Sequence, residues 1–219
     1  GHHFFVDGPV TISDRRFVPD RDILVGTLGR GGRGLYALDV TNPATFGTAN
    51  VMWDIDGTYN TNLGFVLGRP FIAKLNNGDT AVVVPNGINS ATGRAVLFLI
   101  NAFNGSLIKM IDTGVGSPTD DNGLSAPRGV DEDFSGTLDY VYAGDLKGNL
   151  WKFDLANSNT SQWGIANSAP LYTPSTSPVP QPITGGVTTA VNPVNYQRWV
   201  FFGTGRLLTI DDLTNTSLQ

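Results

Sequence analysis

Cysteine is absent from this chain of 219 residues, and its only two histidines are His2 and His3. The absence of cysteine excludes disulfide bonds and thiolate metal sites. Catalysis by a Cys–His pair or a Ser–His–Asp triad needs a histidine base within a folded site, and both histidines stand at the N-terminal end. Because no third ligand lies near them in sequence, we expect no metal site there. Composition therefore points away from these classes of enzyme.

Charge and long apolar runs are also scarce. Charged residues make up 15% of the chain, and the net charge is −5. No basic cluster indicates binding to nucleic acid or to an anionic membrane surface. No apolar run reaches the roughly eighteen residues of a membrane-spanning helix. The first residues lack the basic region of a signal peptide, so we expect the chain to begin inside a longer precursor.

Glycine and proline, in contrast, are abundant, with 27 and 13 residues. Together they indicate many turns between short strands. Apolar residues alternate with polar ones at period two in most segments, and helical periodicity is hard to find. The composition and the periodicity predict an all-β protein.

The predicted strands recur in a fixed order. The first strand of each unit follows a proline, and Pro9, Pro70, Pro127 and Pro182 are 61, 57 and 55 residues apart. A very apolar second strand that ends in glycine follows, at residues 23–26, 81–87, 140–144 and 199–203. The third strand ends in Asp or Asn, at residues 35–39, 97–101, 150–154 and 207–211. An outer strand is predicted at residues 51–55 and 107–111, and a weaker one near 171–172.

Four-stranded units at this period are typical of β-propeller blades. We predict blades near residues 5–60, 64–116, 122–175 and 181–219, which together form one partial propeller domain over residues 1–219. The second strands are apolar on both faces, as expected for strands packed between neighbouring blades. Because the fourth unit lacks an outer strand, we expect about four blades of a larger modified propeller.

One loop carries oxygen ligands at nearly alternate positions. Asp131, Asp133, Ser135 and Asp139 surround Gly136, which allows a tight backbone turn. A hard cation such as Ca²⁺ takes six to eight oxygen ligands, which a short loop can supply. The loop begins like an EF-hand, D-x-[DN]-x-[DN]-G, but a strand rather than a helix follows it.

The predicted calcium site therefore closes at Asp139, and the Thr137 carbonyl is a further expected ligand. Ser135 is a poorer ligand than a carboxylate, which favours a weak site. The alternative is a solvated turn rich in aspartate that joins two strands.

The remaining motifs indicate structural roles rather than catalytic or cofactor-binding ones. Residues 29–34 match G-x-G-x-x-G, but a strand follows where a dinucleotide site needs a helix, so we predict a glycine hairpin. Carboxylate pairs such as Asp54 and Asp56 stand in turn-like contexts, and we predict no catalytic residues. The four tryptophans at positions 53, 151, 163 and 199 are expected to pack between blades. Trp151 and Phe153 should share one face of their strand.

The chain resembles the C-terminal β-propeller domain of the PilC/PilY proteins, which are tip-associated adhesins and biogenesis factors of bacterial type IV pili. The resemblance covers nearly all of the chain. Its motifs include Y-A-L-D-V-T-N-P at 36–43, N-G-L-S at 122–125, D-Y-V-Y-A-G-D-L-K-G-N-L-W-K-F-D at 139–154 and F-G-T-G-R at 202–206.

The resemblance implies a binding protein rather than an enzyme, at the bacterial cell surface on the pilus tip or outer membrane. Its implied partners are minor pilins of the type IV pilus and a host or abiotic surface. It also implies a calcium loop at Asp131, Asp133, Ser135, Thr137 and Asp139 that controls pilus extension and retraction. Ser135 departs from the family, where Asp or Asn is usual.

Two other readings stay open from the sequence. The blades also resemble those of quinoproteins, the pyrroloquinoline quinone dehydrogenases, although these usually carry adjacent cysteines near the cofactor. A sugar-binding propeller is the other alternative, with tryptophan rings as platforms.

Overall fold

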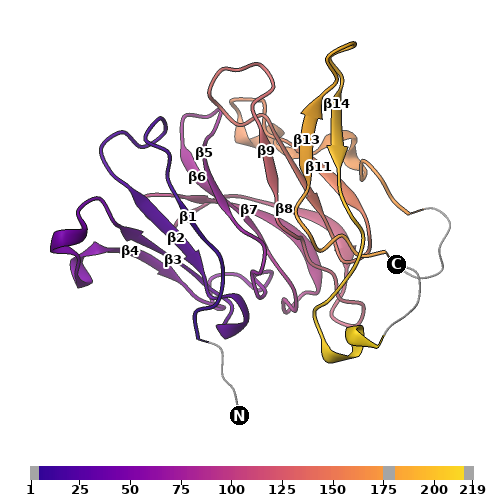
Figure 1. Cartoon of the computed structure of the whole chain (residues 1–219), viewed down its shortest axis with the longest axis horizontal. Helices are drawn as coiled ribbons and strands as arrows, with labels where there is room; N and C mark the ends of the chain where they lie inside the picture. The colour runs from indigo at the N-terminus through magenta and orange to yellow at the C-terminus, as the bar shows by residue number, and fades with distance from the viewer. Residues whose placement is uncertain (1–4, 175–180, 215–219) are drawn as a thin grey trace.

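The regular elements of the described residues are β-strands and short 3₁₀ turns, and the strands form four antiparallel sheets (Figure 1). The structure is a computed structural model and describes residues 5–174 and 181–214. The sheets follow one another along the chain and across the molecule, from β1–β4 at one side to β13–β14 at the other. The all-β prediction is confirmed.

Three sheets have four strands each, and every strand pairs with its neighbours in the sequence. The first sheet contains β1 (Val10–Ile12), β2 (Ile23–Thr27), β3 (Leu35–Asp39) and β4 (Val51–Ile55). The second contains β5 (Phe71–Lys74), β6 (Thr80–Pro85), β7 (Arg94–Asn101) and β8 (Leu107–Gly116). The third contains β9 (Arg128–Val130), β10 (Tyr140–Gly144), β11 (Leu150–Asp154) and β12 (Gly164–Ile165). In the fourth, β13 (Thr188–Val191) pairs with β14 (Arg198–Phe201).

The helical elements are short 3₁₀ turns between strands. They are η1 (Gly29–Gly31), η2 (Pro43–Thr45), η3 (Thr48–Asn50), η4 (Thr160–Gln162), η5 (Ala166–Ser168) and η6 (Ile210–Leu213). In the described part of the chain, no helix has the length and apolar character needed to cross a membrane. The glycine-rich segment at 29–34 is the hairpin between β2 and β3, as predicted.

The core lies between sheets rather than inside any one of them. In β6, Val82 and Val84 pack with the first sheet, whereas Ala81 and Val83 pack with the third. Every residue of β6 is buried because neighbouring sheets cover both of its faces. This alternation confirms the prediction from its two apolar faces.

The tryptophans show which strand faces are covered. Trp151 and Phe153 share the face of β11 that packs on the second sheet, and their exposed fractions are 2% and 0%. Trp53 and Trp163 are also buried. Trp199 does not follow the prediction, because it lies on the outward face of β14 and is 52% exposed. Its neighbour on that face, Phe201, lies 6.0 Å from it between ring centroids.

A buried carboxylate organises the hairpin between β10 and β11. Asp145 is fully buried. Its Oδ1 accepts hydrogen bonds from the backbone N–H groups of Lys147 (2.9 Å) and Asn149 (2.8 Å). Its Oδ2 accepts from the side chains of Asn122 (3.0 Å), Asn149 (2.9 Å) and Trp151 (2.8 Å). Five hydrogen bonds therefore replace the hydration that this carboxylate loses on burial.

The outer strand of the third sheet lies elsewhere than predicted. Gly164 and Ile165 form it, whereas Tyr172 makes only an isolated bridge with Leu150. The turn η4 returns the chain to β11, and Trp163 fixes the turn because its buried ring donates to the Asn157 carbonyl at 2.5 Å. The prediction of an outer strand near residues 171–172 was wrong, because it was based on the apolar character of that segment and did not anticipate that η4 returns the chain to β11 earlier.

The fourth sheet departs most from the predicted repeat. Residues 207–211 were expected to form a strand, but the chain bends there and enters η6. The Asp212 carboxylate accepts the backbone N–H groups of Leu208 and Thr209, each at 2.8 Å, and the Arg206 side chain at 2.9 Å. Such local hydrogen bonds compete with strand pairing.

The segment after Pro182 is not a strand either. Ile183 is fully buried and makes only an isolated parallel bridge with Gly205, because β13 pairs with β14 instead. Its backbone N–H donates to the Asp145 carbonyl at 2.9 Å, and its side chain packs with Tyr142 and Leu150 of the third sheet. The two glycines that follow disfavour a longer strand.

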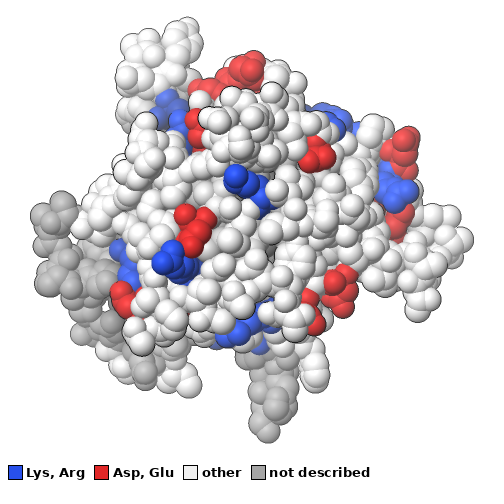
Figure 2. Space-filling view, turned by 180° about the vertical axis from the view of Figure 1, so that it is seen from behind, with Lys and Arg blue, Asp and Glu red and all other residues white. Residues whose placement is uncertain are grey.

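Charged side chains are sparse on the surface. On the face shown in Figure 2, acidic and basic groups are scattered among uncharged residues, and several lie beside a group of opposite sign. Ion pairs such as Arg15–Asp22 (2.7 Å) and Arg94–Asp112 (2.9 Å) join neighbouring segments of one sheet. Exposed pairs of this kind contribute little to stability.

Candidate metal centre

The loop between β9 and β10 holds the predicted metal ligands. Asp131 follows the last residue of β9, and Asp139 precedes the first residue of β10, so the paired strands bring the two ends of the loop together. Ligand oxygens of Asp131, Asp133 and Asp139 all lie within 4.8 Å of one another. The fold therefore brings together the three carboxylates that the sequence singled out.

Backbone N–H groups inside the loop orient two of these carboxylates. The N–H of Ser135 lies 3.1 Å from Asp131 Oδ1 and 3.0 Å from Asp133 Oδ1, and the N–H of Gly136 donates to Asp131 Oδ2 at 2.8 Å. Gly136 has φ +88° and Phe134 has φ +61°, so two residues take the left-handed conformation that lets the chain curl. Hydrogen bonds from the Ser135 side chain and backbone lower the pKa of Asp133.

Asp139 is held differently, because it is 5% exposed and lies at the base of the loop. Its Oδ2 accepts the backbone N–H of Glu132 at 2.8 Å, which ties the two ends of the loop together. Its Oδ1 accepts a hydrogen bond from Asn76 Nδ2 at 3.0 Å. Asp139 therefore supports the loop structurally as well as facing the other carboxylates.

Asn76 reaches this loop from the neighbouring sheet, since it lies in the turn between β5 and β6. Its Nδ2 also lies 3.0 Å from the Leu138 carbonyl and 3.2 Å from the Leu155 carbonyl. Its Oδ1 accepts a hydrogen bond from Thr137 Oγ1 at 2.8 Å. Sequence reasoning missed this residue, because an Asn-Asn-Gly turn does not reveal which distant loop it contacts.

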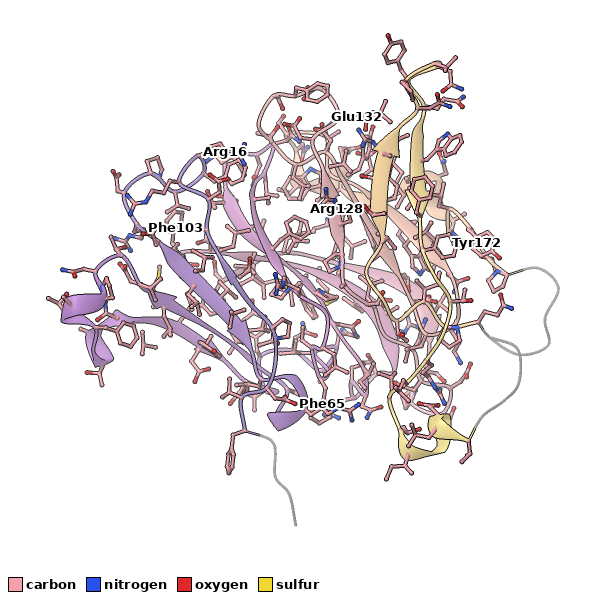
Figure 3. All side chains as sticks on the ribbon, viewed as in Figure 1. Arg16, Phe65, Phe103, Arg128, Glu132 and Tyr172 are labelled. Atoms are coloured by element: carbon pink, nitrogen blue, oxygen red, sulfur yellow. The ribbon has the colours of Figure 1, made fainter. Side chains whose placement is uncertain are left out.

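The opposite side of the loop is tied to the fourth sheet. Arg198, on β14, pairs with Glu132 at 2.7 Å, and the Arg198 side chain is only 15% exposed. Figure 3 shows Glu132 beside the β13–β14 hairpin. The loop of the third sheet is therefore held by a side chain from the sheet on each side of it.

The other two predicted ligands are also placed. Ser135 is exposed, and its hydroxyl lies 2.7 Å from the Thr137 hydroxyl, which in turn donates to Asn76. Among the residues that the structure describes, no Lys or Arg forms an ion pair with Asp131, Asp133 or Asp139. Three converging carboxylates without a basic partner fit the donor set of a hard cation. His2 lies outside the described residues, as does His3.

Comparison with known proteins identifies the family. A sequence model described as the PilY1 beta-propeller domain matches residues 1–219. The chain belongs to the PilY1 β-propeller family. A type IV pilus biogenesis factor PilY1 homolog of Xylella fastidiosa is 40% identical over 234 residues, which cover 100% of this chain. The type IV pilus biogenesis factor PilY1 of Pseudomonas aeruginosa strain UCBPP-PA14 is 35% identical over 96% of this chain.

A solved member of the PilY1 family shares the fold. The crystal structure of the Pseudomonas aeruginosa PilY1 C-terminal domain matches 95% of this chain with a TM-score of 0.83 and 34% sequence identity. The sheets described above are therefore blades of a β-propeller. The chain spans 46% of that structure, and only 16% and 20% of the two curated relatives.

Proposed function

We propose that this chain is a calcium-binding propeller domain of a type IV pilus biogenesis factor. The observation that carries the proposal is the convergence of Asp131, Asp133 and Asp139 within 4.8 Å of one another. The family relationship supports the role in pilus biogenesis, which the names of both relatives state for those proteins. The proposed role is in binding and regulation rather than catalysis.

The donor set suits Ca²⁺ by its chemistry. Carboxylate, hydroxyl and carbonyl oxygens are the ligands that Ca²⁺ prefers, at about 2.3–2.6 Å and in flexible geometry. Asp131, Asp133 and Asp139 would supply the charged ligands, and Ser135 and the Thr137 carbonyl the neutral ones. Because Ser135 adds no charge, we expect a dissociation constant on the order of 10⁻⁵–10⁻³ M.

Bound calcium would draw together a loop that contacts two other blades. Asn76 joins the loop to the second sheet, and the Glu132–Arg198 pair joins it to the fourth. A change in the order of this loop therefore reaches both neighbouring sheets through direct contacts. We propose that calcium acts through these contacts on pilus extension and retraction, at the cell surface and with minor pilins as partners. Attachment to a host or abiotic surface is proposed as a further role.

Asp133 gives the sharpest test of the site. It is exposed and accepts a hydrogen bond from Ser135 within the loop, whereas Asp139 also joins two blades. We expect Asp133→Asn to weaken calcium binding at least tenfold in calorimetric titration of chelator-treated protein, because it removes a charged ligand. Glu132→Gln is the matched control, because it removes one charge from the same loop while the amide oxygen can still accept the hydrogen bond from Arg198. It should change the affinity less than about threefold.

Equal losses of calcium affinity in Asp133→Asn and Glu132→Gln would show that only the net charge of the loop matters, and would refute the proposed metal site. Mg²⁺ should bind more weakly than Ca²⁺, because it demands compact octahedral geometry. Pilus extension is then scored in cells that carry each variant in the full-length protein. Lost calcium affinity with normal extension and retraction would refute the regulatory role and leave the metal site standing.

A further inference from the structure

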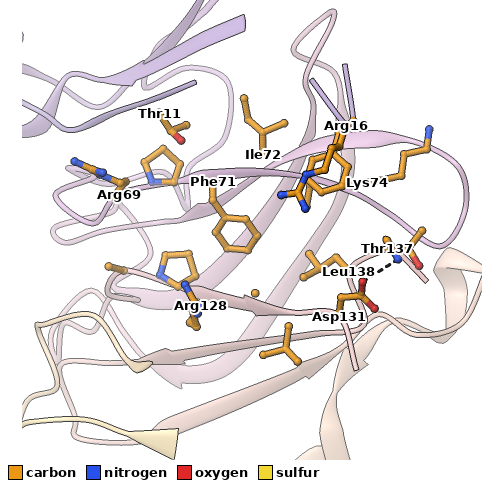
Figure 4. A pocket seen from close by; sticks show the side chains of 18 residues that line it. Thr11, Arg16, Arg69, Phe71, Ile72, Lys74, Arg128, Asp131, Thr137 and Leu138 are labelled. Atoms are coloured by element: carbon orange, nitrogen blue, oxygen red, sulfur yellow. Dashed lines mark hydrogen bonds between the residues drawn. The ribbon is translucent and has the colours of Figure 1, made fainter. Parts of the chain in front are cut away.

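A groove opens where the first strands of three blades approach one another. Its walls come from Thr11 of β1, from β5 and from β9, and its volume is about 510 Å³. Figure 4 shows the ring of Phe71 in the middle of the lining. Pockets that hold ligands have volumes of about 300–1,000 Å³, so the groove is large enough for a short segment of another molecule.

Cations dominate the charged part of this lining. Arg16, Arg69, Lys74 and Arg128 line the groove, against one carboxylate, that of Asp131. In Figure 4, Arg69 and Arg128 lie to one side of the Phe71 ring, and Arg16 and Lys74 to the other. This concentration is unusual in a chain whose net charge is −5.

Two of the arginines have no carboxylate to neutralise them. Arg16 pairs with Asp14 at 2.5 Å, and Lys74 donates to the Gly78 carbonyl. Within residues 5–174 and 181–214, neither Arg69 nor Arg128 has a side-chain hydrogen bond or an ion pair, and both are exposed. Their guanidinium groups are therefore available to a carboxylate, which they can hold through two parallel hydrogen bonds.

The rest of the lining is mostly apolar. Phe71, Ile72, Val130 and Leu138 contribute, together with two prolines. The neutral polar side chains are only those of Thr11 and Thr137, and the Thr137 hydroxyl already donates to Asn76. A sugar, with many hydroxyl groups, needs more neutral hydrogen-bonding partners than this lining offers. An apolar side chain flanked by acidic ones fits it better.

We propose that this groove binds an acidic peptide segment of a partner protein. Carboxylates of the segment pair with Arg69 and Arg128, and an apolar side chain between them packs on Phe71. The apolar contact contributes buried area, and the charged pairs fix the register of the segment.

The calcium loop forms one wall of the same groove, through Asp131, Gly136 and Thr137. This part of the inference rests on the proposed function. Without a cation, the Asp131 charge and the two carboxylates beside it repel an acidic segment. A divalent cation among them removes most of that repulsion, so peptide binding should strengthen when calcium is bound.

The test uses a short blocked peptide with one leucine between two pairs of glutamates, titrated calorimetrically at low salt into the whole chain. We expect saturable binding that weakens as salt is added, and no binding of the matched peptide in which glutamine replaces glutamate. Arg128→Gln should weaken binding about tenfold or more, the order expected for loss of a charge-assisted pair. Lys109→Gln, which removes the same charge from β8 outside the groove, should change binding less than twofold.

Equal losses in Arg128→Gln and Lys109→Gln would overturn the assignment of the groove. Tighter binding of an oligomer of galacturonic acid than of the peptide would overturn the assignment of a peptide ligand. Calcium should strengthen peptide binding to wild type and not to Asp133→Asn. If wild type binds no calcium, the proposed metal site is refuted. Peptide binding that is measured in the presence of chelator and is weakened by Arg128→Gln would still support the groove. Equal peptide affinity with and without bound calcium would overturn only the coupling.

Discussion

Removal of the Asp145 carboxylate should destabilise this protein more than any other single loss of charge considered above. Asp145 is fully buried and accepts five hydrogen bonds, two from backbone N–H groups and three from side chains. The donors join the hairpin between β10 and β11 to Asn122 in the segment before β9 and to the buried ring of Trp151. The Asp145 carboxylate therefore stabilises both the hairpin and the contact of the hairpin with the segment that contains Asn122.

The magnitude follows from those bonds. A hydrogen bond to a charged group contributes about 1.5–3 kcal/mol, but bonds to one shared acceptor do not add independently. In Asp145→Ala, water can enter the vacated space and satisfy some of the donors, whereas the Trp151 Nε1–H and two backbone N–H groups stay in the interior. We expect the free energy of unfolding to fall by about 4–6 kcal/mol.

Urea denaturation followed by tryptophan fluorescence measures this loss. Because a domain of this kind is only about 5–15 kcal/mol stable, Asp145→Asn is needed as a milder variant. The amide keeps the shape but replaces one acceptor oxygen by a donor, so we expect a loss of about 2–4 kcal/mol. Asp120→Ala is the control: its carboxylate is 72% exposed and pairs with Lys147 at the surface, and its loss should stay below about 1 kcal/mol. A loss below about 1.5 kcal/mol in Asp145→Ala, with an unchanged denaturant slope, would refute the role of this carboxylate.

Four further outcomes follow from the structure. Trp151→Ala should lower the free energy of unfolding by about 3–5 kcal/mol by leaving a cavity between blades, and an unchanged thermal midpoint would contradict its burial. Gly136→Ala should destabilise the loop by about 1–2 kcal/mol, because φ +88° is unfavourable for alanine, although no atom lies close to the added Cβ. The variant should also bind calcium more weakly, and a calcium affinity equal to that of wild type would contradict this expectation. Asn76→Ala should weaken calcium binding severalfold without removing a ligand, as measured by calorimetry, and unchanged affinity would show that Asn76 does not position Asp139. Hydrogen bonds from Ser135 lower the pKa of Asp133, so this carboxylate stays charged until the pH falls below the ordinary aspartate value of about 3.9. Calcium affinity should therefore be similar at pH 7 and pH 5. A tenfold drop in affinity by pH 5 would contradict the assignment of Asp133 as a ligand.

The sequence by itself determined the features that depend on local periodicity. Alternation of apolar and polar residues predicted the strands, and the two apolar faces of the segment at 81–87 predicted a strand covered on both sides. The positions of Trp151 and Phe153, two residues apart, placed both rings on one face. Asp131, Asp133 and Asp139 converge because the loop that holds them is short and Gly136 permits its turn. All of these features are properties of neighbouring residues, which is why a single sequence displays them.

The tertiary structure alone decided which distant groups meet. Asn76 reaches the base of the loop between β9 and β10, and Arg198 pairs with Glu132 of that loop, so both contacts join different blades. The third strand predicted for the fourth unit, at residues 207–211, did not form. The Asp212 carboxylate accepts the backbone N–H groups of Leu208 and Thr209, and the chain bends there. The contacts of Asn76 and Arg198 join residues of different blades, so they form only when the blades pack against one another. The contacts of Asp212 are local, but they compete with strand pairing, and the pattern of apolar residues does not show which of the two forms.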